Sequence, residues 1–334
     1  MRAGLLAMVA LGLFALGAQA AEPWRQALDR AAAQNRYAQA FLRDGDTAAA
    51  EKAARDGLKA LPPQVPPAGQ AEARQTSVQL YRRLADVQQI RGRMDDARAS
   101  LLLAKVQAHG DAEAEADVTN DVGLLDWTQG KLDEAEQSLT AALEAYQSLK
   151  VAHMQAVVRG NLGLIALDRF TATDDASHLK TAEGHFTQAR DVFVKEGAKD
   201  DLANQWSNLG LVYRHQKKFV QATKAHQEGL KLDRAAGNRI GEVDSIGNLG
   251  RVAEDSGDIW KARDLYRQAF DLAQRVGYAR GIAHHGLYLM VLLNHANRPA
   301  EARPYGPPAL AAAESLGKPL TIDAIRQQIA VSGR

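Results

Sequence analysis

A small residue returns along this chain at a nearly fixed interval. It is always an alanine, called here the repeat alanine, and a second small residue follows it after seven positions. The repeat alanines are Ala50, Ala97, Ala135, Ala182, Ala222, Ala262 and Ala302, at intervals of 47, 38, 47, 40, 40 and 40 residues. Units of this length bury their apolar faces only by stacking on their neighbours. Because alanine favours helices, the chain is predicted to form one elongated helical array and not two globular domains, which its 334 residues would also allow.

The first 20 residues have the features of a secretory signal peptide. Arg2 precedes an uncharged apolar run from Ala3 to Ala18, and Ala18-Gln19-Ala20 offers a cleavage site between small residues. The run is shorter than the ~20 residues that a spanning helix needs, and no cysteine follows it that could carry a lipid. We therefore expect cleavage after Ala20 and a periplasmic or secreted protein, with a retained membrane anchor as the alternative.

Charge and residue content disfavour several classes of partner and site. The formal net charge is +1, and loss of Arg2 would bring it to zero with both signs interspersed, so neither nucleic acid nor an anionic membrane is an expected partner. Without cysteine there is no disulfide and no thiolate metal site. His284 and His285 are adjacent and point about 100° apart on a helix, which does not suit chelation. No catalytic fingerprint is present, so we expect no metal, no cofactor and no enzymatic activity.

A second small position predicts that each repeat is a pair of helices. It lies twelve residues before the repeat alanine in five repeats and nineteen before it in the fourth, and Met290 replaces it in the seventh. The small residues are Ala38, Ala85, Gly123, Gly163, Gly210 and Gly250. Small residues on facing sides let two helix axes approach closely, and large apolar neighbours fill the remaining volume.

This pattern resembles the tetratricopeptide repeat family over nearly the whole chain after the signal. The fifth repeat is the closest match, with consensus-type residues at Trp206, Leu209, Gly210, Tyr213, Ala222 and Gly229. The 40-residue period is similar to the long-helix branch found in kinesin light chains and bacterial peptide-sensing regulators. The resemblance implies an all-α, right-handed superhelical solenoid of about seven helical hairpins. We assign residues 21–317 to the array and residues 318–334 to a C-terminal capping helix and tail.

Three segments depart from the period. Residues 171–180 account for seven extra residues in the fourth repeat, and their polar character predicts a surface insertion between the paired helices. Pro304, Pro307 and Pro308 interrupt the second helix of the seventh repeat. Beyond it, Pro319 begins a last helix with Ile322, Ile325 and Ile329 on one stripe, as expected for a cap.

Asparagines recur near the small residue of the first helix. Asn161, Asn208 and Asn248 precede it by two positions in three successive repeats, and Asn120 is one position out of register. The resemblance implies that first helices line the concave face, where such a row grips the backbone of an extended peptide in the long-helix branch. An amide offers both a donor and an acceptor for that task. The alternative is that each asparagine bonds the neighbouring repeat and stabilises the stack.

Other first-helix side chains are candidates for selectivity. Asn204, Arg214 and Arg251 fall on the same predicted face, and an arginine could hold a carboxylate of the ligand through two hydrogen bonds. The alternative for each is a solvated groove wall. The sequence therefore predicts a non-catalytic, exported scaffold that binds a peptide or protein segment, with assembly of an envelope complex as its setting. A peptide-responsive sensor and a self-associating structural oligomer are the alternatives, and the oligomeric state stays open.

Overall fold

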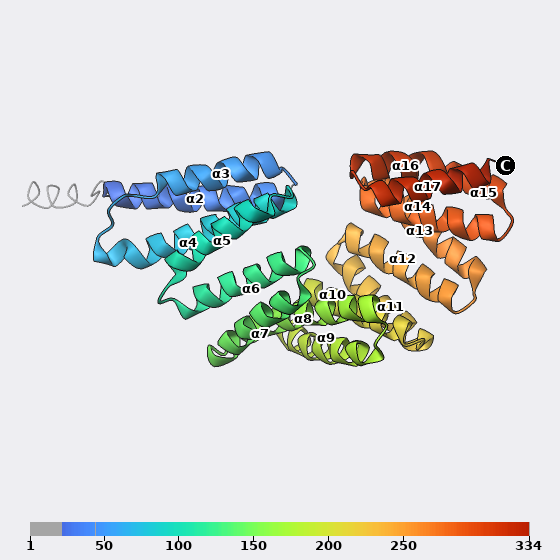
Figure 1. The fold of residues 1–334 in the computed structure, drawn as a ribbon, viewed down its shortest axis with the longest axis horizontal. Helices are drawn as coiled ribbons and strands as arrows, with labels where there is room; N and C mark the ends of the chain where they lie inside the picture. Colours follow the sequence, from blue (N-terminus) through green and yellow to red (C-terminus); the bar gives the residue numbers. More distant parts are fainter. Residues whose placement is uncertain (1–21, 44, 334) are drawn as a thin grey trace, which may run out of the picture. The chain divides into compact units, whose positions relative to one another are not determined.

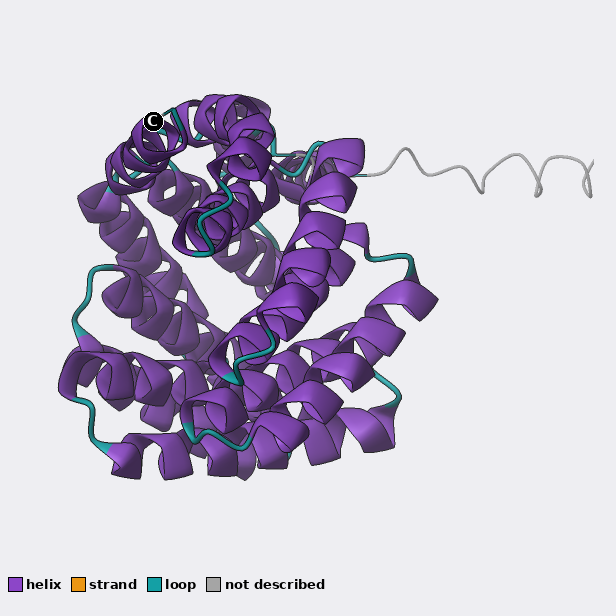
Figure 2. Ribbon diagram, turned by 90° about the vertical axis from the view of Figure 1, so that its right-hand side faces the viewer, coloured by secondary structure: helices purple, strands orange, loops and turns teal. Residues whose placement is uncertain are grey.

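The computed structural model describes residues 22–43 and 45–333, and within them the regular structure is helical (Figure 1, Figure 2). The predicted signal peptide, residues 1–20 with cleavage after Ala20, lies outside the described residues. None of the described helices is both long and apolar enough to cross a membrane. The expectation of an all-α fold is confirmed for the part of the chain that the structure describes.

The helices fall into two compact units, Met1–Lys150 and Val151–Arg334, called unit 1 and unit 2. Unit 1 contains α2 (Pro23–Arg43), α3 (Thr47–Ala60), α4 (Pro67–Ile90), α5 (Met94–Ala108), α6 (Ala112–Thr128) and α7 (Leu132–Ser148). Unit 2 begins with α8 (Ala152–Thr173), α9 (Ala176–Glu196), α10 (Lys199–His215), α11 (Phe219–Ala236), α12 (Arg239–Asp255), α13 (Ile259–Val276) and α14 (Ala279–His295). It ends with α15 (Pro299–Ala302), the 3₁₀ turn η1 (Arg303–Tyr305), α16 (Gly306–Ser315) and α17 (Pro319–Ser332).

Consecutive helices pair as the repeat predicts. The hairpins are α2–α3, α4–α5 and α6–α7 in unit 1, and α8–α9, α10–α11, α12–α13 and α14 with α15–α16 in unit 2. All seven repeat alanines are fully buried. The prediction of about seven hairpins in a solenoid is therefore confirmed for the described residues, whereas the right-handed sense of the superhelix stays a prediction.

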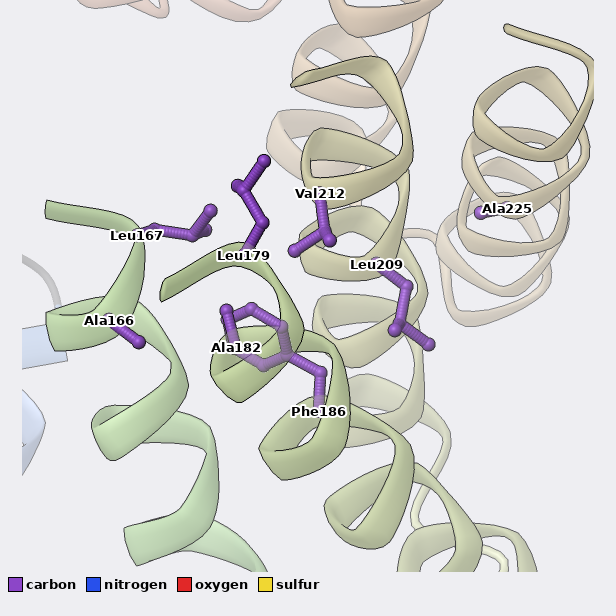
Figure 3. Packing of buried hydrophobic residues seen from close by; sticks show 8 residues of the cluster. All are labelled: Ala166, Leu167, Leu179, Ala182, Phe186, Leu209, Val212 and Ala225. Carbon is purple, nitrogen blue, oxygen red and sulfur yellow. The ribbon is translucent and has the colours of Figure 1, made fainter. Parts of the chain in front are cut away.

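Each regular hairpin of unit 2 is closed by one large side chain set against one glycine. The large residue stands four positions after the repeat alanine, as Phe186 does in α9. A Cβ added to Gly163 of α8 would lie 2.5 Å from the Phe186 ring. Figure 3 shows Phe186 among the buried residues contributed by α8, α9, α10 and α11. The small first-helix residue therefore leaves room for this ring, which explains why a small residue precedes the repeat alanine at a regular distance in most repeats.

The first helices of the hairpins form the inner layer of unit 2. Helices α8, α10, α12 and α14 each contact the next one in this series, and the second helices make no comparable contacts with one another in the described chain. Hairpins that approach along one layer and diverge along the other produce a curved stack whose concave side is the closely spaced layer. We call the surface formed by α8, α10, α12 and α14 the inner face of unit 2.

The insertion expected at residues 171–180 is wrong, because these residues lengthen both helices of the hairpin. Helix α8 continues to Thr173 and α9 begins at Ala176, so only Asp174 and Asp175 remain in the turn. The two helices have 22 and 21 residues, whereas α10 and α11 have 17 and 18. The polar residues form one more turn at each helix end, with Asp175 capping α9 by accepting a 2.8 Å hydrogen bond from the Ser177 amide.

The C-terminal end follows the sequence more closely. The prolines divide the second helix of the last repeat into α15, η1 and α16. Helix α17 covers α14 and α16, and Ile325 is fully buried between them with Ile322 and Ile329 at its sides. It therefore covers apolar residues of the last hairpin, and the assignment of residues 318–334 as a cap stays a prediction.

Most turns between helices contain glycine with positive φ, but two use lysine. Lys217 stands in the α10–α11 turn at φ 59°, where the α12–α13 turn has Gly257 at φ 87°. A left-handed conformation costs a residue with a Cβ about 1–2 kcal/mol. Glycine avoids this cost, but its greater freedom in the unfolded chain destabilises the folded state by about 0.5–1 kcal/mol.

We therefore expect Lys217→Gly to raise the free energy of unfolding by about 0.5–1 kcal/mol. Urea unfolding followed by circular dichroism measures the effect. Lys218→Gly is the matched control, since Lys218 has φ −87° and glycine has no conformational advantage there. Equal effects of the two substitutions would contradict the assignment of strain to Lys217.

Candidate functional site

The predicted asparagines of unit 2 lie at equivalent positions on adjoining first helices. Asn161 is on α8, Asn208 on α10 and Asn248 on α12, and each is half-buried on the inner face. The side chains of Asn208 and Asn248 have no hydrogen bond to any other described residue, whereas Asn161 does interact with a neighbour. Asn120 is in α6 of unit 1, where it is buried and lies 3.4 Å from the Asp121 carboxylate.

The row of equivalent positions ends at a cleft of about 250 Å³ between α12 and α14. The walls are built from residues that a 40-residue step brings together, as the pair Asn248 and Tyr288 shows. The cleft is lined by Asp244, Gly247, Asn248, Arg251, Tyr278, Arg280, Gly281, His284, His285 and Tyr288. It is the part of the inner face where predicted site residues meet a concave surface.

Two arginines give the cleft its positive charge. Arg251 lies with its guanidinium carbon 5.8 Å from the centre of the Tyr288 ring, a cation–π contact. Neither Arg251 nor Arg280 forms an ion pair with a described residue. The N–H groups of Arg251 are available for an anionic ligand, because an aromatic face holds its charge without occupying its donors. Arg280 hydrogen-bonds Tyr278 and interacts electrostatically with Asp244, and its other donors face the cleft.

Asp244 is the acidic group of the cleft. It is partly open to solvent, yet the protein packed around the carboxylate raises its pKa to about 6. The Tyr278 hydroxyl donates a long hydrogen bond of 3.4 Å to it. Burial lowers the pKa of His284, the exposed histidine of the same wall. At pH 7 the cleft therefore holds two arginines, a largely ionised carboxylate and a neutral imidazole.

The floor of the cleft is a buried histidine. His285 packs against Gly247, where a Cβ would lie 2.0 Å from its ring, and its plane stacks on that of Tyr266 at 6.5 Å. Neither ring nitrogen has a hydrogen-bond partner in the described chain. Burial lowers the pKa of His285 to about 4. The bottom of the cleft is therefore a neutral imidazole with one unused hydrogen-bond donor and one unused acceptor.

Arg214 is placed differently from Arg251. It is 9% exposed, and its Nη1 donates a 3.0 Å hydrogen bond to Asp255 within an ion pair. Asn204, also on α10, is exposed on the helix surface. Any role for Arg214 in binding a carboxylate would require it to share its charge with Asp255.

Sequence reasoning missed several of these cleft residues. Asp244, Tyr278, Arg280 and Tyr288 were not singled out, although a signal for one of them was present. Tyr288 occupies the same register as Asn208 and Asn248, one 40-residue step further on. Among the described residues, no group of three or more potential ligands could hold a metal ion.

Known proteins resemble the chain in sequence over one segment and in fold over most of its length. Residues 201–275 match the family model described as "Tetratricopeptide repeat". The regulatory protein AfsR of Streptomyces coelicolor is 31% identical over 101 residues, which are 30% of this chain. The matched segment spans only about 10% of the length of AfsR.

Solved structures share the fold at low sequence identity. A Rap protein complexed with Competence and Sporulation Factor aligns with a TM-score of 0.61 and 11% identity over 90% of this chain and 80% of its own. A tetratricopeptide repeat protein from Parabacteroides merdae aligns with a TM-score of 0.57 and 13% identity over 92% of this chain and 100% of its own. Residues 201–275 are thus tetratricopeptide repeats, and the chain has the helical solenoid fold of tetratricopeptide repeat proteins.

Proposed function

We propose that the inner face of unit 2 binds an extended segment of another protein, without catalysing a reaction on it. The observation that carries this proposal is the pair of half-buried amides, Asn208 and Asn248, that hydrogen-bond no other described residue. An amide held on a helix can pair with a passing peptide backbone through its donor and its acceptor. The Rap protein solved with Competence and Sporulation Factor has the same fold, which supports a binding role for a solenoid of this kind.

In this proposal the cleft between α12 and α14 receives an acidic group of the bound segment. Arg251, held on the Tyr288 ring, and Arg280, which hydrogen-bonds Tyr278, supply charged donors that form no ion pair in the described chain, and His285 supplies a neutral one from the floor. Charge-assisted hydrogen bonds of this type are roughly twice as strong as neutral ones. The asparagines would hold the backbone, and the cleft would select segments with a carboxylate at the matching position.

Capture from cell envelopes tests the proposed function. Wild type is compared with the triple variant Asn161→Ala/Asn208→Ala/Asn248→Ala after chemical crosslinking, once both are shown to melt alike. A triple variant on the outer surface of α11 and α13, Gln227→Ala/Gln268→Ala/Lys231→Ala, is the control. We expect a protein that wild type and control capture and the asparagine variant loses. Equal capture by all three would show that the asparagines do not contact the captured protein.

We also propose that the protein is exported and acts in the periplasm or beyond it, in assembly of an envelope complex. The support is the signal-like pattern of residues 1–20. Mass spectrometry of protein recovered from the periplasmic fraction is expected to find Ala21 as the first residue. Recovery of chains that retain Arg2 would contradict cleavage.

The acidic wall of the cleft gives a pH-dependent prediction. Between pH 7 and pH 5, protonation of Asp244 near its pKa of about 6 removes a negative charge beside Arg251 and Arg280. An acidic segment should therefore bind more tightly as the pH falls, and Asp244→Asn should bind it about fivefold more tightly at pH 7, with a smaller pH effect.

Fluorescence anisotropy with the captured segment, synthesised as a labelled peptide, measures this dependence. Asp264→Asn removes the same charge from the outer side of α13 and is the matched control. Binding that weakens as the pH falls would show that the cleft receives a cation, and would contradict the proposed orientation of the ligand.

A further inference from the structure

Four positions on the second helices of the first six repeats point away from the core, and their residue types differ in one of these helices. The seventh repeat is an exception, because prolines occupy three of its four positions. The four positions stand two, five, six and nine residues after the repeat alanine. Polar or small residues occupy them in five helices: Lys52, Arg55, Asp56, Lys59; Gln137, Thr140, Ala141, Glu144; Gly184, Thr187, Gln188, Asp191; Lys224, Gln227, Glu228, Lys231; and Asp264, Arg267, Gln268, Asp271. In α5 the same positions are Ala99, Leu102, Leu103 and Val106.

These four side chains form an apolar stripe on the outer surface of unit 1. Leu102 is 59% exposed, Leu103 48% and Val106 69%. Spacings of three and four residues place them along one side of the helix. The other repeats act as internal controls, because they show what the same position carries when it faces water. The stripe is therefore a candidate interface, separate from the inner face of unit 2.

We propose that the stripe is covered by α5 of a second copy of this chain, in antiparallel orientation. Charge along the helix favours this partner. Asp95 and Asp96 are exposed in the first turn, and Lys105 and His109 are exposed toward the other end. Neither Asp95 nor Lys105 forms an ion pair with a described residue, whereas Asp96 lies 3.6 Å from Arg93 and His109 lies 3.4 Å from Glu115. Antiparallel pairing sets acidic ends against basic ends, whereas parallel pairing would set like charges together.

The residue order of the stripe suits a two-fold axis between Leu102 and Leu103. With the axis there, Ala99 of one copy faces Val106 of the other, so a small residue meets a larger one. The same register places Asp96 opposite His109 of the second copy, where the two would share the contacts that each makes with Arg93 or Glu115 of its own chain. The contact is therefore self-complementary, as an isologous interface requires.

The size of the contact sets its strength. A single helix stripe buries less than the ~1,200 Å² of a standard stable interface. We expect a reversible dimer with a dissociation constant on the order of 100 µM. Export to a membrane-bounded space or assembly with further copies would raise the local concentration at which such a contact matters.

Sedimentation equilibrium of the purified chain over a range of concentrations tests the proposal. Wild type is expected to rise from the mass of one chain toward that of two. The variant Leu102→Gln/Val106→Lys copies the residues of α11 at these positions, Gln227 and Lys231, so it should fold. It is expected to stay monomeric, with at least a tenfold weaker association. Val220→Gln removes another exposed apolar residue, one that is 86% exposed on α11, and should dimerise like wild type.

Cysteine crosslinking tests the antiparallel register, since the chain has no cysteine of its own. Oxidation should join Leu103→Cys to a second copy of itself. Ala99→Cys and Val106→Cys should crosslink efficiently only when the two variants are mixed. A wild type that is monomeric at every concentration would overturn the proposal, and so would self-crosslinking of both Ala99→Cys and Val106→Cys, which indicates a parallel pair.

Discussion

Replacing His226 by leucine is expected to stabilise the chain at pH 5 by about 2 kcal/mol more than at pH 7. His226 is the large residue that closes the α10–α11 hairpin, at the position that Phe186 occupies in α9 and Tyr266 in α13. Its side chain is fully buried against Gly210, and neither ring nitrogen has a partner in the described chain. Burial lowers its pKa from 6.5 to about 3.

The direction of the effect follows from proton binding. Above pH 6.5 the imidazole is neutral in both the folded and the unfolded chain, so His226 adds no pH dependence. Between pH 6.5 and pH 3 the unfolded chain binds a proton that the folded chain excludes, and the free energy of unfolding falls by about 1.4 kcal/mol per pH unit. Below pH 3 both states are protonated and the loss reaches its limit.

Urea unfolding of wild type and His226→Leu at pH 7 and pH 5 measures this difference. The leucine variant should also be more stable at pH 7, by about 1–2 kcal/mol, because it removes two buried polar atoms that lack partners. His295→Leu, at an exposed position on α14, is the control for replacing a histidine that is not buried. A stability difference between wild type and His226→Leu that is the same at both pH values would contradict a buried neutral imidazole.

Removing both cleft arginines is expected to lower the affinity for the captured segment by about 100- to 10,000-fold. Hydrogen bonds to charged groups contribute about 1.5–3 kcal/mol each, and each 1.4 kcal/mol changes the dissociation constant about tenfold. Arg251→Ala/Arg280→Ala should leave folding intact, since both side chains line an open cleft and neither forms a close ion pair in the described residues. Fluorescence anisotropy with the labelled segment provides the measurement.

The matched control for the arginines is Lys224→Ala/Lys231→Ala on the outer surface of α11. It removes two positive charges from the same unit, so it separates contact in the cleft from long-range attraction. It should change the affinity less than fivefold at physiological salt. Equal losses in the two variants would show that net charge, and not the cleft, attracts the segment.

The packing could be predicted from the sequence because the same residue types recur at equivalent positions in successive repeats. Ala182 and Gly163 carry clear signals, since only small residues fit where a ring such as Phe186 must enter. The polar residues 171–180 led to a wrong prediction of a loop, because a solvent-facing helical turn and a loop have similar composition. The sequence has no signal that distinguishes longer helices from an insertion between them. The division into two units has no signal in the spacing of the repeat alanines.

The cleft could be predicted only in part. Asn248 and Arg251 were chosen for their register and chemistry, and both line it. Arg214 belongs to the same pattern, yet its pairing with Asp255 depends on contact between α10 and α12, which no local sequence feature reports. The unpartnered state of His285 likewise follows from which residues surround it, and neighbouring residues in the sequence do not reveal it.

The most direct test of the binding site is site-specific photo-crosslinking in cells. A photoreactive amino acid replaces Asn248 or His284 on the inner face, and Gln227 or Gln268 on the outer surface of the same unit. We predict that one partner protein is joined from both inner positions and from neither outer position, through a segment that mass spectrometry shows to be acidic. Crosslinks from the outer positions alone would contradict the central claim that the inner face of unit 2 is the binding surface.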